Sequence, residues 1–198
     1  MKVYGDLRSG NCYKVKLLSA MLDIDMQWVD IDVLSNETQA PDFLEKNPNG
    51  KIPILELDDG RYISESNAIL NYLSEGTELL PSDVFAKIKV LQWQFFEQYS
   101  HEPYIAVARS MVKFHGLSED TQEEYESKKE GGYKALRVME NQLSKTDFLV
   151  GNRFTIADIT LFAYTHIAEE GGFDLSNFDA INMWIELVKK QAKFKAMY

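Results

Sequence analysis

The chain has 198 residues and a formal net charge of −10, with ordinary hydrophobic (45%) and charged (26%) fractions. This length suits one large or two small domains with a packed core. The negative charge argues against nucleic acid and anionic membrane surfaces as partners, because both attract basic faces. Cys12 is the only cysteine, so no intrachain disulfide can form and a reducing compartment is expected. No apolar run suggests a membrane span or a secretory segment, and we expect a cytoplasmic protein.

The first part of the chain alternates strand and helix patterns. Residues 2–5 predict a short strand, and residues 28–33 alternate apolar and polar side chains as a second strand does. Between them, apolar residues from Cys12 to Leu22 recur at helical spacing, while Lys14 and Lys16 lie off that stripe. A strand, a helix and a strand at this spacing predict a right-handed crossover and a parallel pair. A short helix is expected around residues 42–45.

The stretch from Asn47 to Leu73 predicts a turn, a β-hairpin and a helix. Pro53 lies at the start of the first strand of this hairpin. If the bond between Ile52 and Pro53 is cis, the backbone of Ile52 turns outward and can pair with an extended peptide. Glu65 and Ser66 open the helix, whose N-terminus attracts anions such as a carboxylate, while the Glu65 side chain can accept from an ammonium group.

These residues resemble the glutathione-binding half of the glutathione S-transferase superfamily, whose signature is Asn-Pro-x-Gly-x-Ile/Val-Pro followed by Glu/Asp-Ser. The matching segments are NPNGKIP at 47–53 and Glu65-Ser66. The resemblance implies a thioredoxin-like α/β domain over residues 1–75. The alternative is an ordinary hairpin followed by a helix. The implied glutathione contacts are Lys51, Ile52, Pro53, Glu65 and Ser66, with Gln39 as a weaker candidate for the glycine end.

Beyond a linker at residues 76–82, the pattern is entirely helical and predicts an all-α domain over residues 83–198. One long helical stretch is expected from Asp83 to His115, with a kink or break at Pro103. A second long helix is expected over residues 121–143, weakened by Gly131 and Gly132. A last helix carries apolar residues between positions 181 and 188 on one face.

A second motif, GNRFTIAD at 151–158, predicts the start of a helix. Thr155 and Asp158 have the spacing of a capping box, and Phe154 and Ile159 have that of a hydrophobic staple. The pattern is similar to a helix-start motif in the all-helical domain of glutathione transferases. We therefore assign Asp158 a structural role and not a catalytic one.

The resemblance locates thiol activation in the loop after the first strand and at the start of the first helix. Ser9 precedes Cys12 by three residues, as the activating serine precedes a cysteine in many theta-like members. A hydroxyl there could donate to the sulfur of glutathione, and it could also cap the helix. Asn11 is the alternative, since an amide can donate as well. We expect Tyr4 to be a strand side chain and Cys12 to pack in the core.

For a second substrate, the resemblance points to the loop after the first strand and to the helix after Pro103. The candidates are Leu7, Tyr104, Ile105 and Arg109. Ile105 and Arg109 share a helix face by their spacing. Core packing of Ile105 and an ion pair of Arg109 remain open as alternatives.

The predicted function is that of a cytosolic glutathione S-transferase that uses glutathione as co-substrate and attacks a small apolar electrophile. The alternatives are a glutathione-dependent disulfide or peroxide reductase, and a non-catalytic binding protein of transferase-like fold. The three histidines are isolated, so no metal site is expected. A homodimer is expected, with the helix after Glu65 and the helix from Asp83 at its interface.

Overall fold

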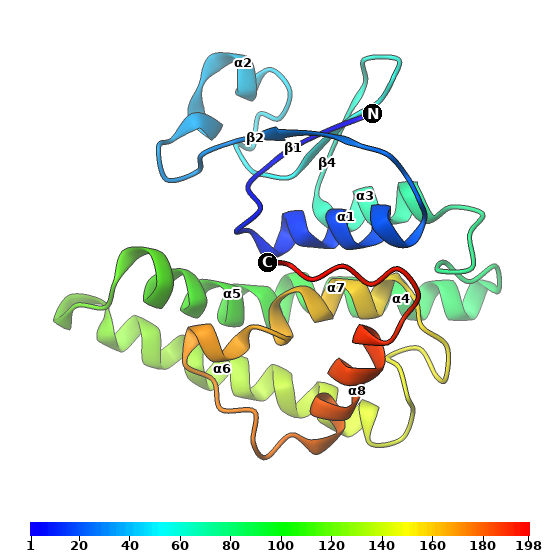
Figure 1. Ribbon diagram of the computed structural model, residues 1–198. Coiled ribbons are helices and arrows are strands. Elements are labelled where there is room, and N and C mark those ends of the chain that lie inside the picture. The colour runs from blue at the N-terminus through cyan, green and yellow to red at the C-terminus, as the bar shows by residue number, and fades with distance from the viewer. The chain divides into compact units, whose positions relative to one another are not determined.

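The structure is a computed structural model that describes residues 1–198. Its contacts divide the chain into two compact units (Figure 1). Unit 1 comprises residues 1–75 together with 192–198, and unit 2 comprises residues 76–191. The expected division differs in two respects: residues 192–198 lie in unit 1 and not in the helical part, and residues 76–82 are part of unit 2.

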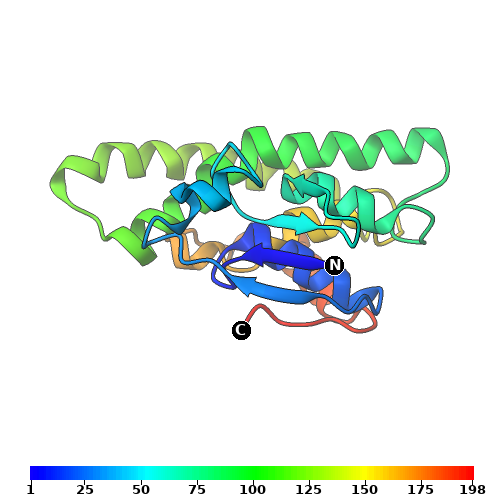
Figure 2. The same ribbon diagram turned by 90° about the horizontal axis from the view of Figure 1, so that it is seen from above.

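Unit 1 is built on a four-stranded mixed sheet with the strand order β2-β1-β3-β4. β1 and β2 run parallel, as the predicted crossover requires, while β3 runs antiparallel to both of its neighbours (Figure 2). This topology confirms the thioredoxin-like fold predicted for the first domain. The strands are β1 (Lys2–Gly5), β2 (Gln27–Asp30), β3 (Ile54–Glu56) and β4 (Tyr62–Ser64).

Two helices of unit 1, α1 (Gly10–Met21) and α3 (Ser66–Ser74), pack side by side against one face of the sheet (Figure 1). The short helices η1 (Glu37–Gln39) and α2 (Pro41–Leu44) belong to the crossing segment between β2 and β3. The predicted apolar stripe of α1 is buried, but Lys14, which was expected to lie off that stripe, has no exposed surface either.

Residues 192–198 run along α1. The hydroxyl of Tyr13 donates to the carbonyl of Lys195 at 2.8 Å, and the ammonium of Lys16 donates to the carbonyl of Met197 at 3.0 Å. These hydrogen bonds to main-chain carbonyls attach the segment to unit 1. Sequence periodicity cannot predict these hydrogen bonds, because every residue has a main-chain carbonyl and no side-chain pattern marks the ones that accept.

Unit 2 consists of helices. As predicted, one helical stretch passes through Pro103, which lies in the first turn of α5 directly after a π-helical turn. A proline removes one backbone hydrogen bond from a continuous helix, and here the interruption coincides with the π-helical turn before α5. The elements are α4 (Val84–Phe96), η2 (Glu97–His101), α5 (Glu102–Ser110), η3 (Met111–His115), α6 (Glu119–Leu143), α7 (Ile156–Thr165), η4 (Ala168–Gly171) and α8 (Asp179–Lys189).

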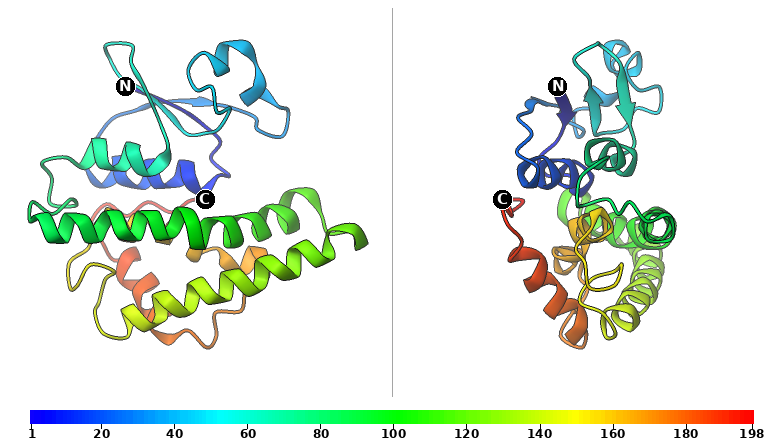
Figure 3. Two further views of the ribbon diagram at one scale, coloured as in Figure 1. Left: turned by 180° about the vertical axis from the view of Figure 1, so that it is seen from behind. Right: turned by 90° about the vertical axis from the view of Figure 1, so that its right-hand side faces the viewer.

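Helix α5 packs against α6, which crosses it at an angle (Figure 3, left). A Cβ atom added at Gly131 would lie 2.1 Å from the ring of Tyr104, and one at Gly132 would lie 2.3 Å from the ring of Phe173. These glycines were expected only to weaken α6. Their absent side chains instead make room for two aromatic rings.

Helix α7 begins at the predicted capping box. The hydroxyl of Thr155 accepts from the amide of Ala157 at 3.2 Å, and the Asp158 carboxylate accepts from the amide of Thr155 at 2.9 Å. The whole of α7 is buried. No helix in the chain combines the length and the apolar character that crossing a bilayer requires.

Candidate functional site

The register of the sheet brings three predicted segments of the site together at one end of its strands. β1 ends at Gly5, and its neighbour Tyr4 pairs with Ile54, the first residue of β3. Ile54 pairs in turn with Ser64, the last residue of β4. The loop before α1, the residues before β3 and the start of α3 therefore lie next to one another.

Ser9 is the N-cap of α1, and its hydroxyl oxygen accepts from the amide of Cys12 at 3.4 Å. Capping uses a lone pair of the hydroxyl and leaves its proton for donation, so a cap can also donate to a sulfur atom. Tyr4 has a different role, because its hydroxyl donates to Glu56 at 2.5 Å. That hydrogen bond and burial raise the pKa of Tyr4 to about 12.

Cys12 lies fully buried in α1. Burial raises the pKa of its thiol to about 12, which leaves almost no thiolate at neutral pH. The side chain contacts the backbone of the first strand so closely that a Cβ atom at Gly5 would lie 2.6 Å from its sulfur. This position fits the packing role that was preferred for Cys12.

The peptide bond between Ile52 and Pro53 is cis, and Ile52 lies outside the β3 ladder. The side chain of Asn47 supports this loop by donating to the carbonyl of Lys51 at 2.8 Å. The amide nitrogen of Gln39 lies 2.6 Å from the position of a Cβ atom at Gly50. Gln39, predicted as a weaker candidate, is therefore close in space to the segment that contains Lys51.

The start of α3 has the features of an anion site. Glu65 precedes the helix with a backbone φ of 69°, a value that residues other than glycine rarely adopt. Its side chain does not cap the helix. Amide groups of the first helical turn can then donate to a ligand. Beside them, the hydroxyl of Ser66 donates to Asn11 Oδ1 at 3.1 Å and accepts from Lys14 Nζ at 3.3 Å.

The candidates for the second substrate occupy different environments. Leu7 is exposed in the loop after β1, and Tyr104 is half-buried against Gly131. Ile105 is fully buried. Arg109 is 3% exposed and forms an ion pair with Glu170 at 2.6 Å. The geometry of Ile105 and Arg109 thus matches the alternatives of core packing and ion pairing, and contact of all four residues with substrate stays a prediction.

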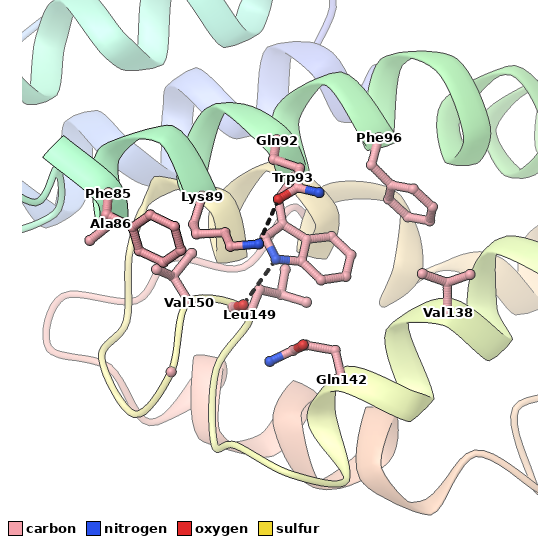
Figure 4. Close-up of a pocket in the computed structure, with 11 residues that line it drawn as sticks. Phe85, Ala86, Lys89, Gln92, Trp93, Phe96, Val138, Gln142, Leu149 and Val150 are labelled. Carbon is pink, nitrogen blue, oxygen red and sulfur yellow. Dashed lines mark hydrogen bonds between the residues drawn. The ribbon is translucent and has the colours of Figure 1, made fainter.

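Sequence patterns did not indicate a cleft of about 460 Å³ in unit 2, between α4, α6 and the loop at 149–151 (Figure 4). The indole N–H of Trp93 donates to the carbonyl of Leu149 at 2.9 Å at the base of this cleft. Aromatic and aliphatic side chains line most of it, and polar groups lie at its rim. The apolar lining residues include Phe85, Trp93, Phe96, Val138, Leu149 and Val150, and the polar ones are Lys89, Gln92 and Gln142.

No group of three or more His, Cys, Asp or Glu side chains comes together in an arrangement that could hold a metal ion. His101 lies in the core, where Nε2 is 2.9 Å from the hydroxyl of Thr165. The ring of His166 stacks on that of Phe162, with the centroids 4.3 Å apart.

The fold and this site define a class of protein. The family model of the glutathione S-transferase N-terminal domain matches residues 1–75, and that of the C-terminal domain matches residues 93–191. The chain belongs to the glutathione S-transferase family.

Solved structures and relatives agree with this assignment. A glutathione S-transferase from Pseudomonas fluorescens Pf-5 is 56% identical, with a TM-score of 0.98 over 99% of this chain and 98% of that one. Glutathione S-transferase F10 of Arabidopsis thaliana is 32% identical over 72% of this chain and 69% of its own length. Elongation factor 1-gamma of Rattus norvegicus is also 32% identical over 80% of this chain, but the match spans only 36% of that protein.

Proposed function

We propose that the protein is a glutathione transferase that activates the thiol of glutathione for attack on a small apolar electrophile. One observation carries the proposal: the hydroxyl of Ser66, at the N-terminus of α3 where Glu65 makes no side-chain cap, lies 3.1 Å from Asn11 in the first turn of α1. A carboxylate bound at α3 and a thiol bound at α1 would be held by adjacent groups. Glutathione carries both, joined by a peptide backbone that the Ile52 segment can pair with.

In this mechanism the thiol proton leaves to solvent, and the sulfur lone pair forms the new carbon–sulfur bond. The leaving group departs with the electron pair of the broken bond. Donors from Ser9 or Asn11, together with the α1 dipole, would stabilise the thiolate. Lowering a thiol pKa of about 8.5 by about two units raises the thiolate fraction at pH 7 from roughly 3% to roughly three quarters. Much of that gain is offset because a less basic thiolate is a weaker nucleophile. Most of the acceleration must come from holding the electrophile against the sulfur.

A glutathione titration by calorimetry tests the proposal. It is performed on the wild type, Ser9→Ala and Asn11→Leu, and is followed by the thiolate absorbance of each bound state. Binding with a thiolate signal in the wild type supports the transferase, and loss of that signal in one variant identifies the activating residue. Absence of binding at millimolar glutathione would refute the proposal and favour a non-catalytic binding protein.

A reductase is the alternative within the same site, with Asn11 contacting the sulfur. It would turn over a glutathione mixed disulfide and leave aromatic halides unreacted. The similarity to elongation factor 1-gamma motivates the non-catalytic alternative, because that relative is named as an elongation factor and not as a transferase. Parallel assays with an aromatic halide and a mixed disulfide separate the two enzymes.

We further propose a homodimer whose interface includes α3 and the exposed face of α4. Apolar side chains are exposed along α4 and the following turn η2, and Phe95 and Tyr99 are 67% and 82% exposed. An exposed apolar stripe of this kind is typical of an interface. The cleft beside Trp93 adds a concave apolar surface next to it (Figure 4). The stripe comprises Val84, Phe85, Ile88, Phe95 and Tyr99.

Phe95→Glu tests the interface by placing a charge within the stripe. We expect the wild type to sediment as a dimer and the variant as a monomer at micromolar concentration. Met183→Glu is the matched control, because Met183 is 66% exposed on α8 and lies outside the stripe. Dimers of Phe95→Glu as stable as those of the control would contradict this interface.

A further inference from the structure

A buried asparagine ties the turn before β3 to its own main chain. The side chain of Asn47, which is 5% exposed, donates through Nδ2 to the carbonyl of Lys51 at 2.8 Å. Its Oδ1 atom accepts from the amide of Asn49 at 3.2 Å. The main-chain carbonyl of Asn47 also accepts from the amide of Gly50 at 2.9 Å. The turn therefore closes on Asn47 directly before Ile52.

The two partners of the Asn47 side chain fix which way its amide points. A main-chain N–H group only donates, and a main-chain carbonyl only accepts. The Oδ1 atom must therefore face Asn49, and the Nδ2 group must face Lys51. The reversed amide would set donor against donor and acceptor against acceptor. Because a buried polar group without a partner is costly, the side chain and the Lys51 carbonyl hold this one arrangement.

The direction of the Lys51 carbonyl decides where the next N–H group points. The peptide bond between Lys51 and Ile52 is trans. In a planar trans peptide the C=O and N–H groups point in opposite directions. Since the Lys51 carbonyl is turned toward Asn47, the N–H of Ile52 points away from it. Neither main-chain group of Ile52 forms a hydrogen bond within the protein, so both are available to a peptide laid alongside.

We propose that Asn47 is a positioning residue that acts through the Lys51 carbonyl to hold the Ile52 N–H in the direction that pairs with the peptide backbone of glutathione. This inference rests on the proposed function, because it requires glutathione to bind along Ile52. A donor that is already oriented spares the complex the cost of ordering the turn on binding. Asn47 therefore contributes to the affinity for glutathione and not to the ionisation of its thiol.

Asn47→Asp tests this role, because it keeps the shape of the side chain and replaces the donor that faces Lys51 by an acceptor. We expect the Kd of glutathione, measured by calorimetry, to rise about tenfold. The thiolate absorbance at saturating glutathione should match that of the wild type. Partial unfolding would instead lower the binding stoichiometry and leave the Kd unchanged.

Asn49→Asp is the matched control. It adds the same negative charge to the same turn, but the side chain of Asn49 is exposed and has no hydrogen-bond partner. Because an exposed charge is screened by salt, we expect the Kd of glutathione to change by less than about twofold in this variant. A Kd in Asn47→Asp equal to that of Asn49→Asp overturns the proposal.

Hydrogen exchange of the Ile52 amide, followed by NMR, reports the geometry directly. Saturating glutathione should slow this exchange about tenfold or more in the wild type, and much less in Asn47→Asp. Full slowing in Asn47→Asp overturns the proposal. If that variant does not fold, Asn47→Ala, which also removes the donor, takes its place and must show the same pattern. Glutathione that binds the wild type without slowing the exchange refutes only this inference, whereas lack of binding refutes the proposed function as well.

Discussion

The carboxylate of Asp158 accepts a hydrogen bond from the indole N–H of Trp184 at 2.9 Å, which joins the start of α7 to α8. The same oxygen accepts from the amide of Leu149 at 3.0 Å. The other oxygen accepts from the amide of Thr155 at 2.9 Å. One buried carboxylate thus satisfies three N–H donors from three segments of unit 2, although burial raises its pKa to about 6.

Asp158→Asn should destabilise the protein by about 1–3 kcal/mol, because an amide replaces one acceptor oxygen by an NH₂ group that faces N–H donors. Urea denaturation at pH 7 measures the loss. Asp179→Asn is the control, since Asp179 is exposed in the first turn of α8 and its replacement should cost a few tenths of a kcal/mol. Equal losses in the two variants would contradict the role assigned to Asp158.

His166 should make stability depend on pH. Burial lowers its pKa from 6.5 to about 4. Between these values the unfolded chain binds a proton that the folded chain does not, so stability rises with pH across this range. The full effect is about 3 kcal/mol. Denaturation curves from pH 4 to 7 should show a shallower rise for His166→Gln than for the wild type, and His115→Gln, at an exposed position, should retain the wild-type slope.

Gly131→Ala should destabilise the protein although alanine is the better helix former. The added Cβ would meet the ring of Tyr104 at 2.1 Å, and overpacking of this kind costs about 1–3 kcal/mol. Thermal or urea denaturation measures the change. In a Tyr104→Ala background the clash is absent, so the same Gly131→Ala change should become stabilising by up to about 1 kcal/mol. A stabilising effect in the wild-type background would disprove the close contact.

Cys12 should behave as a packed side chain and not as a reactive thiol. In the native protein at pH 8 we expect almost no reaction with an aromatic disulfide reagent, and a stoichiometric reaction in denaturant. Cys12→Ala should retain the thiolate signal of bound glutathione and lose about 1–2 kcal/mol of stability, because it leaves a small cavity. Rapid labelling of the folded protein would show that the thiol is accessible.

Local signals in the sequence predicted much of the fold. The strand–helix–strand spacing predicted the parallel pair of β1 and β2, and the Asp-Gly turn predicted the hairpin of β3 and β4. The spacing of Thr155 and Asp158 predicted the capping box of α7. These features could be predicted because each depends on residues that are close in the chain. The end of the first unit at residue 75 likewise coincides with a local signal, the glycine, proline and polar residues that interrupt the helical periodicity there.

The site was predicted in its parts and not in its connections. Ser9, Pro53 and Ser66 were recognised as separate motifs, but the contact of Ser66 with Lys14 spans 52 residues. Tyr104, which packs against Gly131, and Trp184, which donates to Asp158, also lie far from these residues in the sequence. A residue pattern does not specify which ring fills the space above a glycine.

The sequence by itself determined most of the segments that form strands and helices, their approximate bounds, and which family the chain resembles, because turn residues, caps and apolar periodicity act over a few positions. Only the tertiary structure decided that Lys14 is buried beneath Ser66, that residues 192–198 join unit 1, and that a cleft lies beside Trp93. These features depend on the register of the sheet and on the packing of helices, which bring together side chains that no local pattern relates.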